Sequence, residues 1–324
     1  MIIVTGAGGF IGSNVVADLN EQGCTDIVLV DRLGGDGKWR NIAKRQFSEF
    51  VFPQELDGFL ANRPRATAVF HLGAISSTTA TDADEVIEAN FRTSARLWKW
   101  CARMSTPFIY ASSAATYGNG EGGFDDDESR LSSLSPLNLY GWSKHVFDRW
   151  AIEQARRGEA PPHWAGLKFF NVYGPNEYHK GDMQSLVAKN AGRIAADQPV
   201  RLFKSYREGY ADGEQLRDFV HVADCTRAML WLAEGKCGPG LFNLGTGRAR
   251  SFRDLIEATA KALGKAVAIE YQEMPEALRA NYQYFTQAPM EKLRRAGFAA
   301  SFRSLEEGVA DYVTQFLAGH DRYR

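Results

Sequence analysis

Closely spaced cysteines and histidines are missing from this sequence of 324 residues. Its four cysteines are far apart and form no C-x-x-C motif: Cys24, Cys101, Cys225 and Cys237. Its six histidines show no metal-ligand spacing either. This pattern argues against a disulfide framework and against a zinc site. We therefore expect ordinary thiols in a reducing compartment, and no bound metal.

Excess charge of one sign and long apolar runs are also missing. The chain has 38 lysines and arginines against 39 aspartates and glutamates, which gives a formal net charge of -1. Such a balance provides no field that would attract nucleic acid or an anionic membrane. No apolar stretch is long enough to span a bilayer, and the one at residues 1–4 is too short for a signal peptide. We expect a cytoplasmic protein with small-molecule partners, and neither nucleic acid nor membrane among them.

What the sequence does contain is an alternation of short apolar runs with helix-length segments. The runs rich in β-branched residues are Ile2–Thr5, Ile27–Val30, Ala68–Leu72 and Phe108–Ala111, with two later ones at Trp164–Phe170 and Leu241–Leu244. This alternation predicts an α/β fold, a doubly wound parallel sheet covered by helices. With 44% hydrophobic residues, a chain of 324 residues can bury one large core or two modest ones, and its length predicts about two domains.

The long excursion between the last two runs predicts a second, smaller lobe. We assign residues 1–170 with 218–247 to the sheet domain, and 171–217 with 248–324 to the lobe. Helices are expected in the lobe at Met183–Ala196 and Phe252–Leu263. The acidic stretch Phe124–Glu128 and the charged, glycine-containing stretch Arg207–Gln215 are expected to be exposed loops. The lobe should cover the carboxyl edge of the sheet, where open α/β folds bind ligands.

A glycine motif follows the first predicted strand. Gly6, Gly9 and Gly12 have the spacing G-x-x-G-x-x-G, and a helix is expected from Ile11 to about Gln22. Glycine is needed here because the backbone turns tightly and approaches a pyrophosphate, which the N–H groups at the helix start can bind. An acidic residue closes the second strand, as dinucleotide-binding folds require. The motif therefore predicts a nicotinamide dinucleotide site.

The residues after the second strand leave the choice between NAD and NADP open. Asp31 suits a ribose with two free hydroxyls, which favours NAD. Arg32 and Lys38 are cations that would suit the 2′-phosphate of NADP. The alternative is that both are surface cations without a ligand.

A tyrosine and a lysine four residues apart indicate acid/base chemistry. Tyr140 and Lys144 lie on one face of a predicted helix that continues through Trp150. A nearby cation lowers the pKa of a phenol and makes it a usable proton donor and acceptor. The strand Phe108–Ala111 leads to Ser113, whose hydroxyl at the carboxyl edge can hydrogen-bond the substrate oxygen. The three side chains form a catalytic hypothesis for oxygen-linked redox chemistry.

Taken together, the glycine triplet, Ser113, and Tyr140 with Lys144 resemble the extended short-chain dehydrogenase/reductase family, over nearly the whole chain. This family includes sugar-nucleotide epimerases, dehydratases and reductases, and the resemblance implies a Rossmann-type fold. Its dehydratases carry Thr-Asp-Glu beside the serine, whereas this chain has Ala114, Ala115 and Thr116 there. The resemblance therefore implies an epimerase, an isomerase that works on a nucleotide sugar.

A narrower resemblance is to the subfamily of epimerases that act on an ADP-activated heptose in lipopolysaccharide precursor synthesis. It rests on the segments Met1–Gly6, Ser76–Thr79, Ala111–Gly118, Phe170–Pro175, His179–Gly181, Phe242–Gly247, Tyr282–Gln283 and Phe285–Gln287. It implies inversion at C6 of the heptose through a transient ketone, NADP rather than NAD, and a homo-oligomer. The alternatives are an epimerase or epimerase-reductase for another nucleotide sugar, and a non-enzymatic NADP-binding regulator.

This resemblance also implies roles for individual residues. The catalytic residues would be Ser113, Tyr140 and Lys180, with Lys144 supporting the tyrosine; for Lys180 the alternative is a surface lysine. The cofactor would contact Gly6, Gly9, Phe10, Ile11, Gly12, Asp31, Arg32, Lys38, Leu72, Gly73, Ala74, Ile75, Ser76, Asn90, Tyr140, Lys144, Val172 and Lys180. The substrate would contact Ser113, Asn171, Asp182, Lys189, Phe203, Lys204, Ser205, Tyr206, Arg217 and Tyr282.

Several positions depart from the subfamily pattern. Asp182 replaces a serine, Lys189 replaces a histidine, and Pro53 replaces a lysine near the adenosine end of the cofactor. The stretch Arg207–Gln215 is an insertion beside the expected substrate site. These changes keep the reaction type and leave the exact sugar and nucleotide open.

Overall fold

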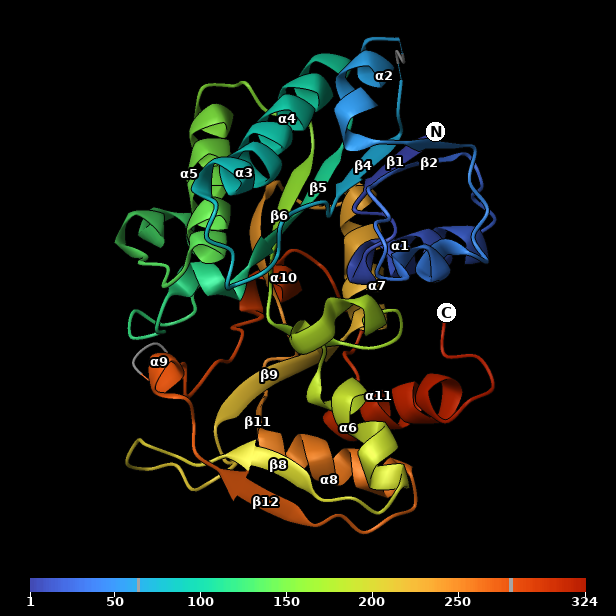
Figure 1. Ribbon diagram of the computed structural model, residues 1–324. Coiled ribbons are helices and arrows are strands. Elements are labelled where there is room, and N and C mark those ends of the chain that lie inside the picture. Colours follow the sequence, from blue (N-terminus) through green and yellow to red (C-terminus); the bar gives the residue numbers. More distant parts are fainter. Residues whose placement is uncertain (63–64, 280–281) are drawn as a thin grey trace.

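A seven-stranded parallel sheet forms the upper part of the computed structural model, which describes residues 1–62, 65–279 and 282–324 (Figure 1). The strand order is β10-β6-β5-β4-β1-β2-β3, and every neighbouring pair is parallel. The strands are β1 (Ile2–Thr5), β2 (Ile27–Val30), β3 (Glu49–Val51), β4 (Ala68–His71), β5 (Phe108–Ser113), β6 (Trp164–Phe169) and β10 (Gly240–Leu244). The predicted doubly wound α/β fold is confirmed.

Helices cover both faces of this sheet. The α-helices of the described residues are α1 (Phe10–Glu21), α2 (Leu56–Asn62), α3 (Ala83–Val86), α4 (Thr93–Met104), α5 (Leu139–Arg156), α6 (Leu186–Ala195), α7 (Val222–Ala233), α8 (Phe252–Ala262), α9 (Glu276–Arg279), α10 (Glu291–Arg295) and α11 (Leu305–Tyr312). The 3-10 and π segments are η1 (Lys38–Ile42), η2 (Pro53–Glu55), η3 (Ile87–Arg92), η4 (Ala114–Tyr117), η5 (Glu128–Ser133), η6 (Tyr178–Met183) and η7 (Val313–Leu317).

Successive strand residues point to opposite faces, and both faces are buried. In β1, Val4 packs in the core that includes Val15 of α1 and Met229 of α7. Its neighbour Ile3 packs in the other core, which includes Trp98 of α4 and Phe147 of α5. A strand that is buried on both sides reads as a continuous apolar run, because no face is left for polar residues. This explains why the apolar runs of the sequence predicted the strands of this sheet.

The lower lobe contains two small sheets. One has the order β11-β9-β7 and the other pairs β12 with β8. Their strands are β7 (Asn171–Tyr173), β8 (Val200–Phe203), β9 (Leu216–His221), β11 (Ala249–Ser251) and β12 (Ile269–Gln272). Helices α6 and α8 occupy the predicted helical stretches. Each of these two helices starts where a serine side chain, Ser185 or Ser251, accepts a hydrogen bond from a backbone N–H of the first turn.

The expectation that Phe124–Glu128 is a solvated loop holds for Asp125 and Asp127, which are exposed, and is wrong for the residues that alternate with them. Phe124 is packed in the core, and Asp126 is buried. The carboxylate of Asp126 accepts a hydrogen bond from the Asn243 backbone N–H (2.7 Å), and Glu128 accepts one from that of Leu241 (2.9 Å). These acidic side chains accept hydrogen bonds from backbone N–H groups on the edge of β10 that pairs with no other strand of the described residues. Their role is therefore structural.

The strand order changes direction at β1, which lies between β2 and β4. The chain therefore leaves the ends of β1 and β4 toward opposite sides, and a crevice opens between them. Doubly wound sheets bind their ligands at this switch point. Within the described residues, no helix combines the length and apolar character needed to cross a membrane.

Candidate active site

A cavity of about 900 Å³ lies between the carboxyl edge of the sheet and the lower lobe. A volume of this size suits a small organic ligand or cofactor. Most of the residues predicted for the site contribute to its wall. These are Gly6, Gly9, Phe10, Ile11, Gly12, Asp31, Lys38, Leu72, Gly73, Ala74, Ser76, Ser113, Tyr140, Lys144, Asn171, Val172, Lys180, Asp182, Lys189, Phe203 and Tyr282.

The glycine motif forms a cradle between β1 and α1. Gly6 has a positive φ of +65°, which L side chains rarely adopt. A Cβ at Gly12 would lie 2.1 Å from the carbonyl oxygen of Gly6, so only glycine permits this approach. No side chain caps the start of α1. The cradle thus offers backbone N–H groups and the positive end of a helix dipole to a diphosphate.

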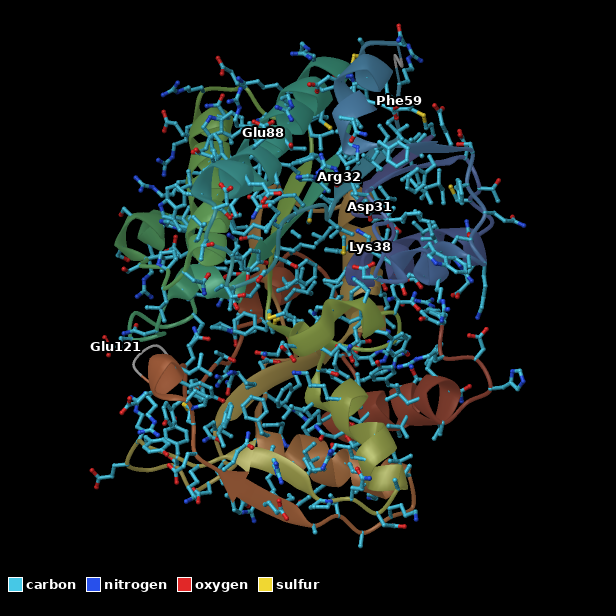
Figure 2. All side chains as sticks on the ribbon, in the orientation of Figure 1. Asp31, Arg32, Lys38, Phe59, Glu88 and Glu121 are labelled. Carbon is cyan, nitrogen blue, oxygen red and sulfur yellow. The ribbon has the colours of Figure 1, made fainter. Side chains whose placement is uncertain are left out.

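Asp31 directly follows β2 at the rim of this cradle, next to Arg32 and Lys38 (Figure 2). Its carboxylate accepts hydrogen bonds from the backbone N–H of Gly8 (2.7 Å) and of Arg32 (2.6 Å). The Lys38 ammonium donates to the same carboxylate at 2.8 Å. Asp31 is therefore neutralised by Lys38, and both line the cavity, whereas Arg32 lies outside its wall.

Tyr140 and Lys144 face the cavity from the first two turns of α5. The Asn138 side chain caps this helix by accepting a hydrogen bond from the Gly141 N–H (2.8 Å). This cap fixes the start of α5, and Tyr140 lies in its first turn. Burial raises the pKa of Tyr140, and a hydrogen bond from Ser113 opposes that rise. Burial lowers the pKa of Lys144 to about 8. Below that pH the lysine is charged, and its charge favours the phenolate form of Tyr140.

Two adjacent serines end β5, and the structure gives them different roles. Ser112 donates a hydrogen bond to the buried carboxylate of Asp148 (2.6 Å), which also accepts one from Lys168 (2.8 Å). Ser113 accepts a hydrogen bond from the Ala115 N–H (3.1 Å) and keeps its hydroxyl proton for Tyr140. The Ser113 hydroxyl is thus directed to Tyr140, whereas that of Ser112 is held by Asp148, and the contact of Ser113 with a substrate oxygen stays a prediction.

Lys180 lies in η6, in the segment that follows β7, and lines the same cavity as the start of α5. Its ammonium is 5.0 Å from the centre of the Phe10 ring, at the start of α1. Burial lowers the pKa of Lys180, while the buried carboxylate of Glu177 opposes this change. The lysine is half-buried and lines the same cavity as Tyr140. Lys180 therefore shares a cavity with Tyr140, and its catalytic role stays a prediction.

Some predicted residues lie outside the cavity wall: Arg32, Ile75, Asn90, Lys204, Ser205, Tyr206 and Arg217. Asn90 supports the wall from behind, because it bonds both the N–H (2.8 Å) and the carbonyl (2.9 Å) of Ile75. Lys204 is held at the surface by Glu273 at 2.7 Å. Arg217 is buried behind Tyr282, with its guanidinium 5.2 Å from that ring.

The lower lobe contributes residues that the sequence analysis did not select. Apolar and amide side chains dominate: Leu186, Leu202, Gln215, Phe219, Phe252, Leu255, Gln272 and Gln283. Most come from helices and short strands, and Gln215 and Gln283 from the connecting segments; these parts meet only in the folded lobe, so no local spacing marked them. Within residues 1–62, 65–279 and 282–324, no group of three or more histidine, cysteine, aspartate or glutamate side chains is arranged to hold a metal ion.

A glycine cradle at the switch point of a parallel sheet, facing a serine, a tyrosine and a lysine, defines a dinucleotide-dependent enzyme of the α/β class. Within that class, the chain belongs to the NAD dependent epimerase/dehydratase family, whose model matches residues 2–245.

Relatives at full length carry one name repeatedly. The ADP-L-glycero-D-manno-heptose-6-epimerase of Fusobacterium nucleatum is 48% identical over 334 residues and is covered completely, as is this chain. The crystal structure of the Helicobacter pylori enzyme of that name has a TM-score of 0.81 at 27% identity, covering 96% of this chain and 94% of the other. A Thermus thermophilus UDP-glucose 4-epimerase in complex with NAD has a TM-score of 0.73 at 25% identity, with coverage of 96% and 97%.

Proposed function

We propose that this enzyme inverts C6 of the heptose in ADP-D-glycero-D-manno-heptose to give ADP-L-glycero-D-manno-heptose, a step toward lipopolysaccharide core precursors. The observation that carries the proposal is the presence of two proton-transfer groups, Tyr140 and Lys180, in one cavity beside a dinucleotide cradle. The names of the full-length relatives support the choice of sugar.

The chain's own residues provide the proton transfers and the orientation. When bound, the nicotinamide would supply the hydride chemistry, since its oxidised form can accept hydride from the C6 alcohol and its reduced form can return that hydride to the ketone. Tyr140 accepts the hydroxyl proton, aided by the charge of Lys144 and by the hydrogen bond from Ser113. We assign to Lys180 the proton transfer for the other epimer, and its position in the same cavity supports this role. Each face of the ketone thus meets its own acid/base.

The lower lobe is proposed to hold the nucleotide sugar, and the sheet domain the dinucleotide, with the domain limits given above. Arg217 is buried behind Tyr282 of the cavity wall, and within the described ranges it forms no ion pair. An unpaired guanidinium is suited to bind the diphosphate of the substrate. Two positions that depart from the subfamily pattern contact each other, since the Lys189 ammonium donates to the Asp182 carbonyl at 2.6 Å. Both line the cavity, which supports their assignment to the sugar-nucleotide end. We place the enzyme in the cytoplasm as a homo-oligomer, following the family resemblance.

For the cofactor we propose NADP. The support is Lys38, which lies on the cavity wall with an ammonium that has donors beyond the one used on Asp31. A 2′-phosphate would share that ammonium with the carboxylate, and the neutralised Asp31 would not repel it strongly. NAD remains the alternative that Asp31 by itself favours.

The purified enzyme is expected to carry NADP(H). The cradle and Lys38 would grip the pyrophosphate and the 2′-phosphate at once, which slows release. Mass spectrometry of the supernatant after denaturation checks this. Recovery of NAD alone contradicts the choice of cofactor.

Lys38→Met is expected to weaken NADP binding by about tenfold to 100-fold, as loss of a charged hydrogen bond does. NAD binding should change little, because NAD has no 2′-phosphate for Lys38 to bind, and the Asp31 carboxylate released from Lys38 stays available to the ribose hydroxyls. Titration of both cofactors followed by calorimetry measures the two affinities. Arg40→Met, which removes another cation of η1, is the matched control and should change neither. Equal weakening of NAD and NADP would contradict the role of Lys38.

A panel of sugar nucleotides tests the substrate directly. The purified enzyme is incubated with ADP-D-glycero-D-manno-heptose, UDP-glucose and UDP-glucuronic acid, and both epimers of each are followed by NMR. Conversion of the heptose alone is the expected result. Conversion of another sugar with no reaction of the heptose would replace the proposed substrate and keep the reaction class.

A further inference from the structure

A short segment after η7 crosses from the lower lobe to the sheet domain. In Figure 1 it rises from the lobe toward α1. Lys44 forms an ion pair with Asp321 (2.7 Å) and donates a hydrogen bond to the carbonyl of Tyr323 (2.5 Å). We call residues 321–324 the strap. The partner of Asp321 and Tyr323, Lys44, lies in the segment that follows η1.

Arg324 anchors the strap on α1. Its guanidinium forms ion pairs with Asp18 and with Glu21, the latter at 3.0 Å, and donates a hydrogen bond to the Asn14 side chain at 3.3 Å. The side chains of Arg324 and Asp18 are only 16% and 15% exposed, so this pair is shielded from water and stronger than a surface pair.

The strap also holds the loop that carries Lys180, defined here as residues 174–183. The backbone N–H of Arg324 donates to the Asn176 side chain (3.0 Å). Tyr178 donates its hydroxyl proton to the carbonyl of Arg322 (2.6 Å), and the Arg322 guanidinium lies 3.8 Å from the Tyr178 ring centre. The strap is therefore bonded on one side to α1 and on the other to this loop.

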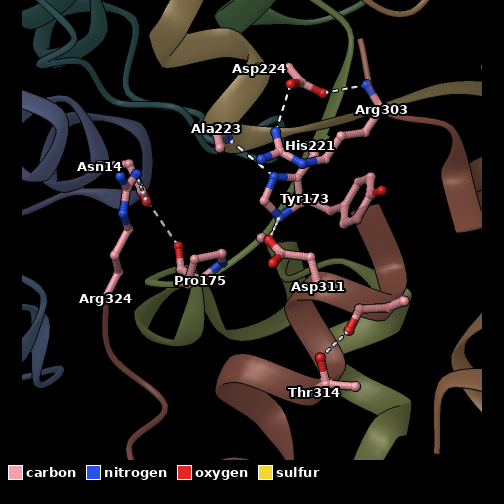
Figure 3. Close-up of polar contacts among 12 residues, drawn as sticks. Asn14, Tyr173, Pro175, His221, Ala223, Asp224, Arg303, Asp311, Thr314 and Arg324 are labelled. Carbon is pink, nitrogen blue, oxygen red and sulfur yellow. Dashed lines mark hydrogen bonds and ion pairs between the residues drawn. The ribbon is translucent and has the colours of Figure 1, made fainter. Parts of the chain in front are cut away.

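The loop and α1 contact each other at the same place. Asn14 lies between Arg324 and Pro175, and donates a hydrogen bond to the Pro175 carbonyl at 3.0 Å (Figure 3). Asn176 donates to Ser13 at 3.0 Å. Helix α1 starts at the glycine cradle, and the loop carries Lys180, whose ammonium lies near Phe10 of α1. The distance between the loop and α1 therefore sets the position of Lys180 in the cavity.

We propose that the strap is a positioning device for Lys180, in which Arg324 holds the 174–183 loop against α1 at the distance that catalysis requires. The inference rests on the proposed function for the role of Lys180, and on the contacts alone for the restraint. Arg324 touches neither the cavity wall nor Lys180, and so acts only through the loop.

Arg324→Met in the enzyme with its bound nucleotide tests the proposal. We expect kcat to fall about tenfold or more, since small misplacements of a catalytic group are costly, with KM nearly unchanged. Hydrogen exchange of residues 174–183, followed by mass spectrometry, should become faster. Burial lowers the pKa of Lys180, so a loosened loop should move an apparent pKa of the pH–rate profile upward. A general loss of stability would leave that pKa in place.

Further variants keep the test decisive. Arg324→Lys keeps the charge and should restore most of the protection. Asp18→Asn should give the same loss, and the double variant no more than either single one. Lys265→Met, which removes an ion pair with Asp197 elsewhere, is the matched control and should change nothing. Unchanged exchange of the loop in Arg324→Met would overturn the strap. Faster exchange in an enzyme that epimerises no sugar would support the strap and contradict the proposed function.

Discussion

Tyr140→Phe is expected to lower turnover by about 10²–10⁴-fold, the typical loss when a positioned acid/base is removed. The phenylalanine ring keeps the packing at the start of α5, and only the proton-transfer group disappears. Cofactor binding should stay close to that of the unmodified enzyme, because the glycine cradle and Lys38 are untouched. Initial rates by NMR, together with a titration of NADP, measure the two effects separately.

The matched control is Tyr271→Phe, which removes a hydroxyl that accepts a hydrogen bond from Arg253 outside the cavity wall. It should leave turnover nearly unchanged. Near-normal turnover of Tyr140→Phe, in a protein that still binds NADP, would remove Tyr140 from the mechanism.

Lys180→Met is expected to reduce epimerisation by a factor on the order of 10² or more. Without the ammonium, one of the two epimers loses its proton acceptor, and the ketone cannot be reduced productively on that face. Lys261→Met on α8, a change at an exposed lysine, is the control for the loss of a positive charge. Epimerisation by Lys180→Met at the unmodified rate would contradict the two-base scheme and leave Tyr140 to serve both faces.

A half-reaction separates the two bases further. With Tyr140 intact, Lys180→Met should still reduce a ketone or aldehyde analogue of the nucleotide sugar, seen as loss of NADPH absorbance in a single turnover. The double variant of Tyr140→Phe with Lys180→Met should lose both activities. Failure of the single variant in this half-reaction would mean that Lys180 acts on both faces.

The sheet and the cofactor cradle were predictable from the sequence because their signals are local. The strands at residues 2–5 and 27–30 have the predicted bounds, and the others differ by one or two residues. A strand buried on both faces forms an uninterrupted apolar run, and a glycine cradle requires a fixed spacing. The edge strand β3 was missed, since it has only three residues and pairs on one side.

The lower lobe and the acidic loop were less predictable, because their contacts join distant parts of the chain. Strand β9 pairs with β7 and β11, which are far from it in sequence, and β8 pairs with β12. Asp126 reads as a solvated charge until β10 is placed beside it. The same reasoning applies to Lys180, whose position near Phe10 depends on a loop that the sequence marked only through a family resemblance.

Inversion at C6 by removal and return of the same hydride is tested most directly with ADP-D-glycero-D-manno-heptose that carries deuterium at C6. The enzyme is incubated with this substrate in ordinary water, and the product is analysed by NMR. We expect the C6-inverted heptose with its deuterium retained at C6, because hydride leaves and returns through the bound nicotinamide. Absence of inversion, or inversion with replacement of the deuterium by solvent hydrogen, would contradict it.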